Sequence, residues 1–442
     1  MSSPLFVHFH ARAGRLRVLS TIGSALAFLA AAHVAAAPLP LTLGQAQQQA
    51  IDRSRQLSAQ DQAVAAAHEM AVAAGQLPDP VLKVGIDNLP VSGPDRLSLG
   101  NDFMTMRRVG VSQELTRADK LHWRSARLER EADKAQAEKD VATAAIQRDT
   151  ALSWLEVFYT EQMADVVARQ AVLSRQEIEA AEAGYRGGRG NQADILAARL
   201  ALLALNDRGS EIGRRLRVAQ TMLARWTGGE VAVVGQPDID SIRLDPASLD
   251  SDLAHHPQIA VLNKQEDIAQ ADANLAQANR RTDWSVEVAF QQRGPAYSNM
   301  VSVGISVPLQ WDRKNRQDRE LAAKLALVEQ AKAERDEMLR DHVAGTRALI
   351  VEWTSGKERV LRYAREVLPL ASERSQAALA AYRGGKAALA EVLAARRNET
   401  EVRMQALQLE LDTARLWAQL NFLFPEGGAV QHTAMNYQQE SK

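Results

Sequence analysis

The chain has 442 residues, of which 24% are charged and 46% hydrophobic, a composition that argues for a folded protein and against disorder. Its 53 basic and 54 acidic side chains almost cancel, so it lacks the clustered basic excess that nucleic-acid binding needs. Cysteine is absent, which excludes disulfides and a lipid-modified N-terminal cysteine. The sequence contains no H-E-x-x-H motif, phosphate-binding loop or nucleophile elbow, so we expect neither an enzyme nor a cofactor.

The N-terminus has the features of an export signal. Arg12, Arg15 and Arg17 precede an apolar stretch over residues 18–32, and small residues follow at 35–37. A basic start, a short apolar stretch and an A-x-A-like site are typical of a cleaved secretory signal. The alternative, a membrane anchor, needs a longer apolar stretch. We therefore predict a signal peptide over residues 1–36 and export to a bacterial envelope.

The rest of the chain is an internal duplication. Tyr185 and Tyr382 open two related Tyr-Arg-Gly-Gly turns, which lie 197 residues apart. Two copies of such length indicate two similar halves and not a solenoid. Two further segment pairs match, residues 194–199 with 391–396 and residues 109–112 with 303–306. We predict a first structural repeat over residues 37–238, a second over 239–428 and a flexible C-terminal tail over 429–442.

Each half has the same order of elements: a helix, two short strands joined by a loop, a very long helix, a glycine turn and a return helix. At about 1.5 Å per residue the long helices reach about 100 Å, so they must pack side by side along their length. The glycines supply the positive φ that lets the chain reverse. The helices are expected at residues 43–76, 118–183 and up to 226 in the first half, and at 249–281, 315–381 and up to 424 in the second.

A proline interrupts the second long helix. Pro369 removes one backbone hydrogen bond about a dozen residues before the turn and is expected to bend the helix. The first half has Val172 at the equivalent position, so the two halves should curve differently. Unequal curvature would make the arrangement of helices narrower toward the turns. The alternative is that the bend has no function.

The short strands alternate between apolar residues and small, polar or charged ones. This alternation is typical of strands that face lipid on one side and a lumen on the other. Trp284 and Trp311 lie at strand ends, where an aromatic girdle would lie. A half-buried soluble hairpin gives the same alternation, but the signal peptide and the duplication favour the membrane. The apolar positions are Leu82, Val84, Ile86, Trp284, Val286, Val288, Phe290, Val301, Val303, Ile305, Val307 and Leu309.

Four strands per chain require an assembly. Closed membrane barrels begin at about eight strands, and open strand edges are not tolerated in lipid. No apolar stretch after the signal reaches the length of a membrane helix, so only the strands can enter the membrane. We predict a homo-oligomer in which each subunit contributes a four-stranded wedge.

Together these features resemble the TolC-type outer-membrane efflux factors. The resemblance covers about residues 41–425 and rests on the two Tyr-Arg-Gly-Gly turns, each followed by Asp-Ile-Leu or Glu-Val-Leu. It implies a mainly α-helical chain with a membrane β-barrel, assembled as a homotrimer with twelve strands and a periplasmic helical barrel. Both turns would lie at the periplasmic tip, and segments 88–106 and 292–300 would face outside. The implied partners are outer-membrane lipid, a periplasmic adaptor (membrane fusion protein) and an inner-membrane pump.

A narrower resemblance concerns the cargo. Residues 85–90 and 102–108 resemble channels of heavy-metal resistance-nodulation-division (RND) systems, which export copper and silver, or cobalt, zinc and cadmium. Some of those relatives carry a lipidated N-terminal cysteine, which this chain lacks. Multidrug efflux and type I secretion channels are the alternatives. A periplasmic adaptor, with one hairpin, and a structural coiled-coil protein, which needs no strands, fit less well.

Candidate functional residues gather at the two turns. Asp194 and Glu391 follow the turns, and in a trimer each would form a ring of three carboxylates that attracts cations. The alternative, compatible with the first, is helix-start chemistry, because acids favour the first turn. The resemblance implies that the Tyr382 hydroxyl holds the tip closed, with Tyr185 as its repeat mate. It also implies that the turns dock the adaptor or pump through Arg186, Gly187, Gly188, Arg383, Gly384 and Gly385.

Two residue pairs invite a metal interpretation. Met104 and Met106 are weak candidates for a soft metal, because thioethers suit Cu(I). Strand-end packing is favoured, since two methionines do not complete a coordination sphere. His255 and His256 are interpreted as structural, because no third ligand lies nearby in sequence.

Overall fold

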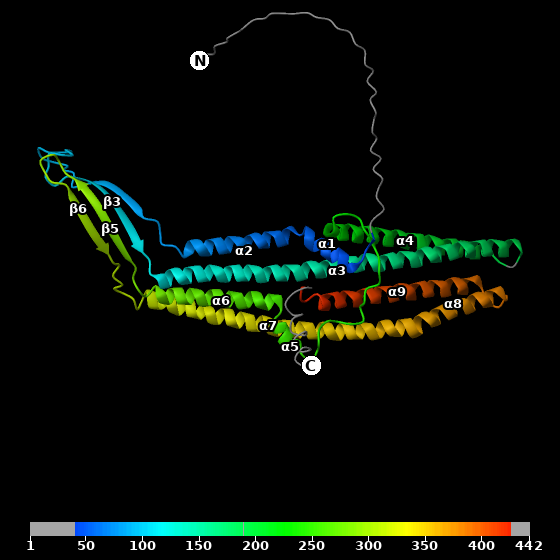
Figure 1. Ribbon diagram of the computed structural model, residues 1–442. Helices are drawn as coiled ribbons and strands as arrows, with labels where there is room; N and C mark the ends of the chain where they lie inside the picture. The colour runs from blue at the N-terminus through cyan, green and yellow to red at the C-terminus, as the bar shows by residue number, and fades with distance from the viewer. Residues whose placement is uncertain (1–39, 189, 426–442) are drawn as a thin grey trace, which may run out of the picture. The chain divides into compact units, whose positions relative to one another are not determined.

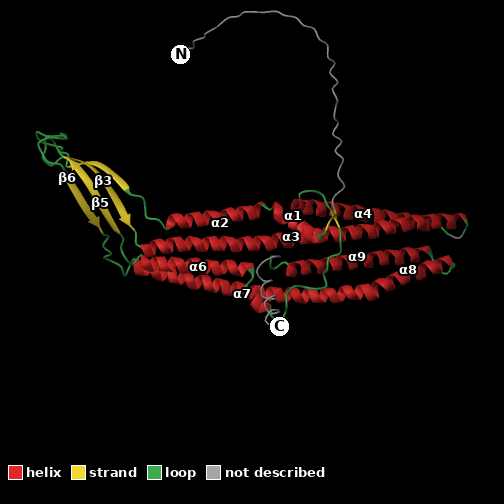
Figure 2. Cartoon of the chain, in the orientation of Figure 1, coloured by secondary structure: helices red, strands yellow, loops and turns green. Residues whose placement is uncertain are grey.

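The computed structural model describes residues 40–188 and 190–425. The predicted signal peptide over 1–36 and the predicted tail over 429–442 lie outside the described residues. Helices make up most of the described chain, and the longer strands gather into one sheet (Figure 2).

The described chain passes twice through a similar series of elements, as the duplication predicts (Figure 1). The first series is β1 (Pro40–Leu41), α1 (Leu43–Arg53), α2 (Arg55–Ala74), β2 (Val81–Asp87), β3 (Met106–Leu115), α3 (Ala118–Arg186), α4 (Gln192–Thr227) and β4 (Ala232–Val233). The second is α5 (Leu249–Ala254), α6 (Pro257–Ala278), β5 (Trp284–Gln292), β6 (Met300–Ser306), α7 (Gln317–Arg362), the π-helical η1 (Tyr363–Val367), α8 (Leu368–Arg383) and α9 (Leu389–Asn421).

Helix α3 is the central element, and α2, α4, α6 and α9 all pack along it. With 69 residues it is about 100 Å long, which confirms the predicted long helix. Many of its buried positions are alanine, which lets neighbouring helices approach closely. Near its middle the side chain of Trp154 is buried, and its indole N–H donates to the Leu41 carbonyl at 3.1 Å. No helix within the described ranges is both long and apolar enough to span a membrane.

Two helices that we predicted as continuous are each divided. The first is divided at Ser54, whose hydroxyl accepts the N–H of Leu57 at 3.2 Å and so caps α2. The second is divided at residues 255–256, where the His256 Nδ1 accepts the N–H of Gln258 at 3.2 Å and Pro257 begins α6. Side chains that satisfy the first free N–H groups allow a new helix to begin.

The second long helix is also interrupted, at the place where Pro369 predicts a disturbance. Residues Tyr363–Val367 form a π-helical turn, in which the N–H of Leu368 donates to the Tyr363 carbonyl. Because Pro369 has no N–H, the carbonyls one turn earlier lose their usual partner, and a π-turn redistributes the bonds. Helix α3 continues through Val172 without such a break, so the halves differ as expected.

The sheet has the strand order β2-β3-β5-β6, and all neighbouring strands are antiparallel. The sheet therefore has the four strands that the sequence predicts, with β3 and β5 joining the two halves, while β1 and β4 form a separate short parallel pair. Strand β6 ends at Ser306, so Val307 and Leu309 lie beyond it although they continue the alternation. Pro308 cannot donate a ladder hydrogen bond, which explains the early end.

Candidate functional site

One face of the sheet, here named the apolar face, carries almost only apolar side chains. The register aligns them across the strands, with Val109 opposite both Val84 and Phe290 and with Val288 opposite Val303. Their exposed fractions are large, up to 71% for Val84. An exposed apolar surface of this kind marks contact with lipid or with another protein. The exposed apolar members of the face are Leu82, Val84, Ile86, Val109, Val111, Leu115, Trp284, Val288, Phe290, Val301, Val303 and Ile305.

The opposite face, here named the ionic face, has a charged cluster around Glu287. Its carboxylate binds the Lys83 ammonium at 2.5 Å and the Arg108 guanidinium. Lys83 and Glu287 lie on β2 and β5, with β3 between them, and Gly110 of β3 is the register partner of Lys83. A Cβ on Gly110 would lie 2.8 Å from that of Ala289, so no side chain fits there. The sequence shows charges at alternate positions, but it did not reveal this cluster.

The sheet is open at both edges. Within the described residues, β2 and β6 are each paired on one side only. Edge strands present unpaired N–H and C=O groups, which favour pairing with another strand. The hydrogen bonding of this sheet is therefore incomplete in a single chain.

The two Tyr-Arg-Gly-Gly turns have the same backbone geometry. Gly188 and Gly385 have φ of 71° and 70°, the left-handed conformation that glycine adopts most readily. After α8, the N–H of Lys386 returns to the Ala381 carbonyl at 2.9 Å and closes the helix end. The preceding glycines, Gly187 and Gly384, have φ of −84° and −80°, which other residues adopt freely. Arg186 and Arg383 are exposed beside them.

The predicted tip residues have different surroundings. Tyr382 is half-buried, packs on the small cluster of Ala181, Leu389 and Val392, and lies beside Gly184 of α3. Its repeat mate Tyr185 is 51% exposed. The Asp194 carboxylate accepts the N–H of Asn191 at 3.1 Å in a capping box, so it serves the start of α4. Glu391 is exposed in the first turn of α9.

A buried ionic network near the turns was not found from the sequence. Arg396 of α9 binds Glu177 of α3 at 3.6 Å and Glu399 at 3.4 Å, and Glu399 also binds Arg403 at 2.8 Å. Burial raises the pKa of Glu177, although Arg396 acts in the opposite direction. Burial also acts to raise the pKa of Glu399, but the Arg403 hydrogen bond helps to bring it below its usual value. The sequence does mark this position, because Arg396 is the repeat mate of Arg199 in the matched segments 391–396 and 194–199.

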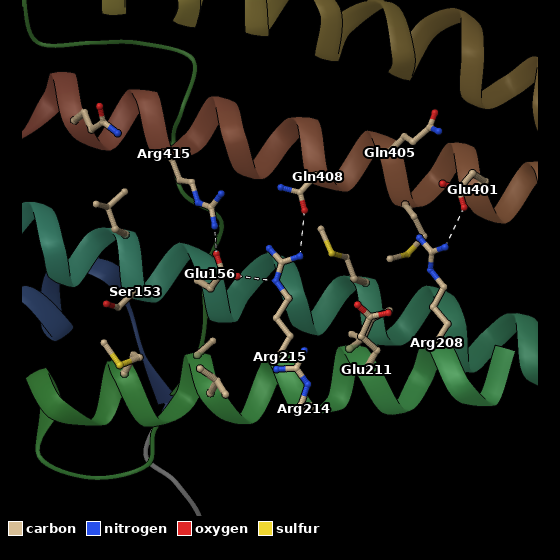
Figure 3. A pocket seen from close by; sticks show the side chains of 18 residues that line it. Ser153, Glu156, Arg208, Glu211, Arg214, Arg215, Glu401, Gln405, Gln408 and Arg415 are labelled. Carbon is tan, nitrogen blue, oxygen red and sulfur yellow. Dashed lines mark hydrogen bonds and ion pairs between the residues drawn. The ribbon is translucent and has the colours of Figure 1, made fainter. Parts of the chain in front are cut away.

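Figure 3 shows a groove of about 800 Å³ that is lined by α3, α4 and α9. Ion pairs cross it, both within the first half and between the two halves of the chain. Glu156 of α3 binds Arg215 of α4 at 2.8 Å and also Arg415 of α9. Arg208 of α4 binds Glu401 of α9 at 3.1 Å. Such partly exposed pairs contribute at most about 1 kcal/mol each, so their effect is mainly to align α4 and α9.

The structure gives the candidate metal residues other surroundings. In the described ranges, no group of three or more His, Asp or Glu side chains is arranged to hold a metal. His256 caps α6, and His255 Nδ1 bonds the Ser251 carbonyl at 2.9 Å, in keeping with their structural interpretation. Met104 and Met106 lie at the end of the sheet where β3 begins, and Met104 is 48% exposed.

His256 should make stability depend on pH. Its ring lies 4.6 Å from that of His342 and 5.5 Å from that of Phe424. Burial, with the nearby His342, lowers its pKa from 6.5 to about 4. As pH falls from 6.5 to 4, His256 becomes protonated in the unfolded chain but stays neutral in the folded chain. The free energy of unfolding therefore falls by about 3 kcal/mol over this range.

We expect the melting temperature of the detergent-purified protein to fall over this pH range, and to fall less in His256→Asn. Asparagine keeps the cap acceptor but does not titrate. Equal pH dependence in both proteins would show that His256 is not the titrating group.

No protein-family model matches the chain. The cobalt-zinc-cadmium resistance protein CzcC of Cupriavidus metallidurans is 23% identical over 327 residues, which cover 72% of this chain and 77% of CzcC. The solved structure of CusC matches with a TM-score of 0.74 at 16% identity, and the match covers 88% of this chain and 93% of the CusC chain. The solved structure of the outer membrane protein VceC of Vibrio cholerae matches with a TM-score of 0.70 at 16% identity, over 86% of this chain and 95% of the VceC chain. The chain therefore has the fold of the TolC-type outer-membrane channels, the family that its repeated turns resemble.

Proposed function

We propose that the protein is the outer-membrane exit channel of a tripartite RND-type efflux system and conducts cargo passively from the periplasm to the exterior. The observation that carries this proposal is the four-stranded sheet, with an exposed apolar face, an ionic face and two open edges. Such a sheet is satisfied in lipid only when copies close it into a barrel, with the apolar face outward. Three copies would give twelve strands, as the resemblance implies.

The duplication supports closure by copies of the same chain. Helix α6 packs between α3 and α7, whereas its repeat mate α2 packs closely only on α3 within the described residues. The neighbour that α2 lacks corresponds to α7 of another copy. The sheet repeats this pattern, because β3 pairs with β5 between the halves while β6 and β2 remain free to pair between copies.

The grooves between the helices support the same arrangement. A second groove, of about 680 Å³, is lined by α7, the first residue of η1 and α9, and includes Arg359 and Tyr363. It corresponds by repeat to the groove of Figure 3, whose walls are α3, α4 and α9, but its third wall is missing. Helix α4 of a neighbouring copy would supply that wall. Exposed apolar residues in the first turns of α4 are available for this contact: Leu196, Leu200 and Leu203.

The tip turns are proposed to dock the adaptor and the pump. Both halves have a glycine pair, yet only Gly188 and Gly385 need glycine for their backbone conformation. Gly187 and Gly384 are therefore explained by the close approach of a partner to the exposed turn. Arg186 and Arg383 would contact acidic groups of that partner.

Conductance in planar bilayers tests whether the protein is a channel. A double variant that removes the Tyr382 hydroxyl and the Asp194 charge tests whether these residues hold the tip closed. We expect discrete conductance steps for the wild type and several-fold larger ones for Tyr382→Phe with Asp194→Gln. Glutamine at position 194 keeps the capping box while it removes the charge. Glu391→Gln should lower cation preference at low salt, where screening is weakest.

Absence of conductance in the wild type would exclude a channel. Unchanged conductance in the double variant would place the gate elsewhere, and unchanged selectivity would reduce Glu391 to a helix-start acid.

Heavy-metal cations are the proposed cargo class. CzcC is named for cobalt, zinc and cadmium resistance, and residues 85–90 and 102–108 resemble channels of heavy-metal systems. The alternatives remain the channels of multidrug efflux and of type I secretion. Growth of a strain that lacks the gene, on graded metal salts and on antibiotics, separates them by which resistance is lost.

A further inference from the structure

One ion pair on the ionic face crosses an intervening strand. The Lys83 Nζ lies 2.5 Å from the Glu287 Oε2, although β3 separates their strands β2 and β5. Neighbouring strands are about 4.8 Å apart, so the two side chains meet across a gap of about 10 Å between their backbones. The residue of β3 beside Lys83 is Gly110, which has no side chain to keep them apart.

The two members of this ion pair are repeat mates of each other. Gly110 and Gly304 occupy the same position in the matched segments 109–112 and 303–306. Lys83 pairs with Gly110 in the first hairpin, and Glu287 pairs with Gly304 in the second. The duplication has therefore set a lysine in one half where the other half has a glutamate.

Two glycines at the open edges have no explanation within one chain. Gly85 of β2 and Gly304 of β6 do not have positive φ, and a Cβ at either position would meet nothing within 4 Å. Where the halves join, by contrast, Gly110 is opposite Ala289, and a Cβ on Gly110 would lie 2.8 Å from that of Ala289. A glycine inside a strand often marks a close approach of another backbone.

The junction between copies brings these two glycines together. Gly304 is the repeat mate of Gly110, and Gly85 is the repeat mate of Ala289, because each lies two residues after its charged mate. A junction with the same register as that of β3 and β5 sets Gly304 of one copy opposite Gly85 of the next. The two glycines then lie side by side, with no side chain above either of them.

We propose that Glu287 of each copy also binds Lys83 of the next copy, across Gly304, just as it binds Lys83 of its own chain across β3. The inference rests on the proposed trimeric channel, and the partner is a second copy of this chain. In a closed trimer, three lysines and three glutamates would alternate in an unbroken ring around the lumen. The ring would lie on the path of every ion that passes.

Both side chains can take a second partner. Within one chain the Glu287 carboxylate binds Lys83 through Oε2 and Arg108 through Oε1. A carboxylate has about four acceptor sites and an ammonium has three donors, so each group keeps free capacity. The Lys83 side chain is 43% exposed on the edge strand, where the next copy would reach it. The repeat mate of Arg108 is Ser302, so no second arginine competes for the junction.

Carbodiimide coupling in mixed trimers tests the ring, because the reagent joins a carboxylate to an adjacent amine as an amide without a spacer. Lys83→Arg chains keep Glu287 but have no amine at position 83, since the guanidinium stays protonated. Glu287→Gln chains keep Lys83 but lack the carboxylate. When the two are co-expressed, the Lys83–Glu287 amide can form only between copies, at one junction of each mixed trimer.

The expected result is a covalent dimer on denaturing gels from the mixed trimers, at a level clearly above that of either variant alone. Mass spectrometry of the dimer band should identify the amide between residues 83 and 287. Coupling at other lysines is the same in all three samples and sets the background.

The outcomes separate the ring from the channel itself. Mixed trimers that conduct, but give no more covalent dimer than either variant alone, would overturn the ring and leave the channel standing. Wild-type protein that neither assembles nor conducts would instead refute the proposed function on which the ring depends.

Discussion

Val288→Arg is expected to destabilise the assembled protein by about 2–4 kcal/mol, the cost of an arginine on the lipid face near the middle of a membrane. Val288 lies at the centre of β5, is 49% exposed, and has Val111 and Val303 as its register partners. Its side chain would face the acyl chains directly. The expected measurement is a lower melting temperature of the oligomer on semi-native gels, with a larger monomer fraction.

Ser306→Arg provides the matched control. Ser306 alternates with Ile305 and lies on the ionic face, where an arginine would remain in water. Its cost should be much smaller than that of Val288→Arg. Equal losses in the two variants would show that the faces have been assigned the wrong way or that neither meets lipid.

A disulfide between Ser302→Cys and Asp87→Cys in the same chain is expected to link neighbouring copies covalently. Val109 pairs with Phe290 where the two halves join, and their repeat mates Val303 and Ile86 would pair in the same way between copies. That antiparallel register sets Ser302 opposite Asp87 of the next copy. Opposed residues of antiparallel strands have Cα atoms about 4.5–5.5 Å apart, within disulfide reach. The protein has no cysteine of its own, so every link is diagnostic. Oxidation should convert monomers into covalent trimers on non-reducing gels.

Two comparisons control the cross-link. Each single cysteine variant should remain monomeric under the same conditions. Ser306→Cys with Asp87→Cys should not link, because the same register sets Ser306 opposite Lys83. A link in this pair but not in the first would replace the inferred register with a different one.

The sequence predicts most of the architecture because its strongest signals are local. Strand alternation and the repeated turns identify the sheet and the helix reversals, and Pro369 marks the place of the π-turn. The breaks at Ser54 and His256 depend on single capping hydrogen bonds, which a helical pattern does not distinguish from continuation. The end of β6 before Pro308 was missed because the alternation runs past it.

The candidate sites are less predictable because their contacts join distant segments. Lys83 and Glu287 are 204 residues apart in sequence and lie on strands separated by β3. Their side chains meet because the residue of β3 beside Lys83 is Gly110, which has no side chain to keep them apart. Arg396 joins α9 to α3 through Glu177, although its repeat mate Arg199 pairs within its own half, with Glu182. A duplicated sequence identifies both arginines, but only the packing of the two halves distinguishes their roles.

The mass of the purified assembly tests the central claim, that one chain forms a third of a closed channel. Light scattering of the detergent-extracted protein, with the detergent contribution subtracted, should give the mass of three chains. Four strands with two open edges cannot be satisfied alone in a membrane. A stable monomer that keeps its full β-sheet signal by circular dichroism would contradict the account.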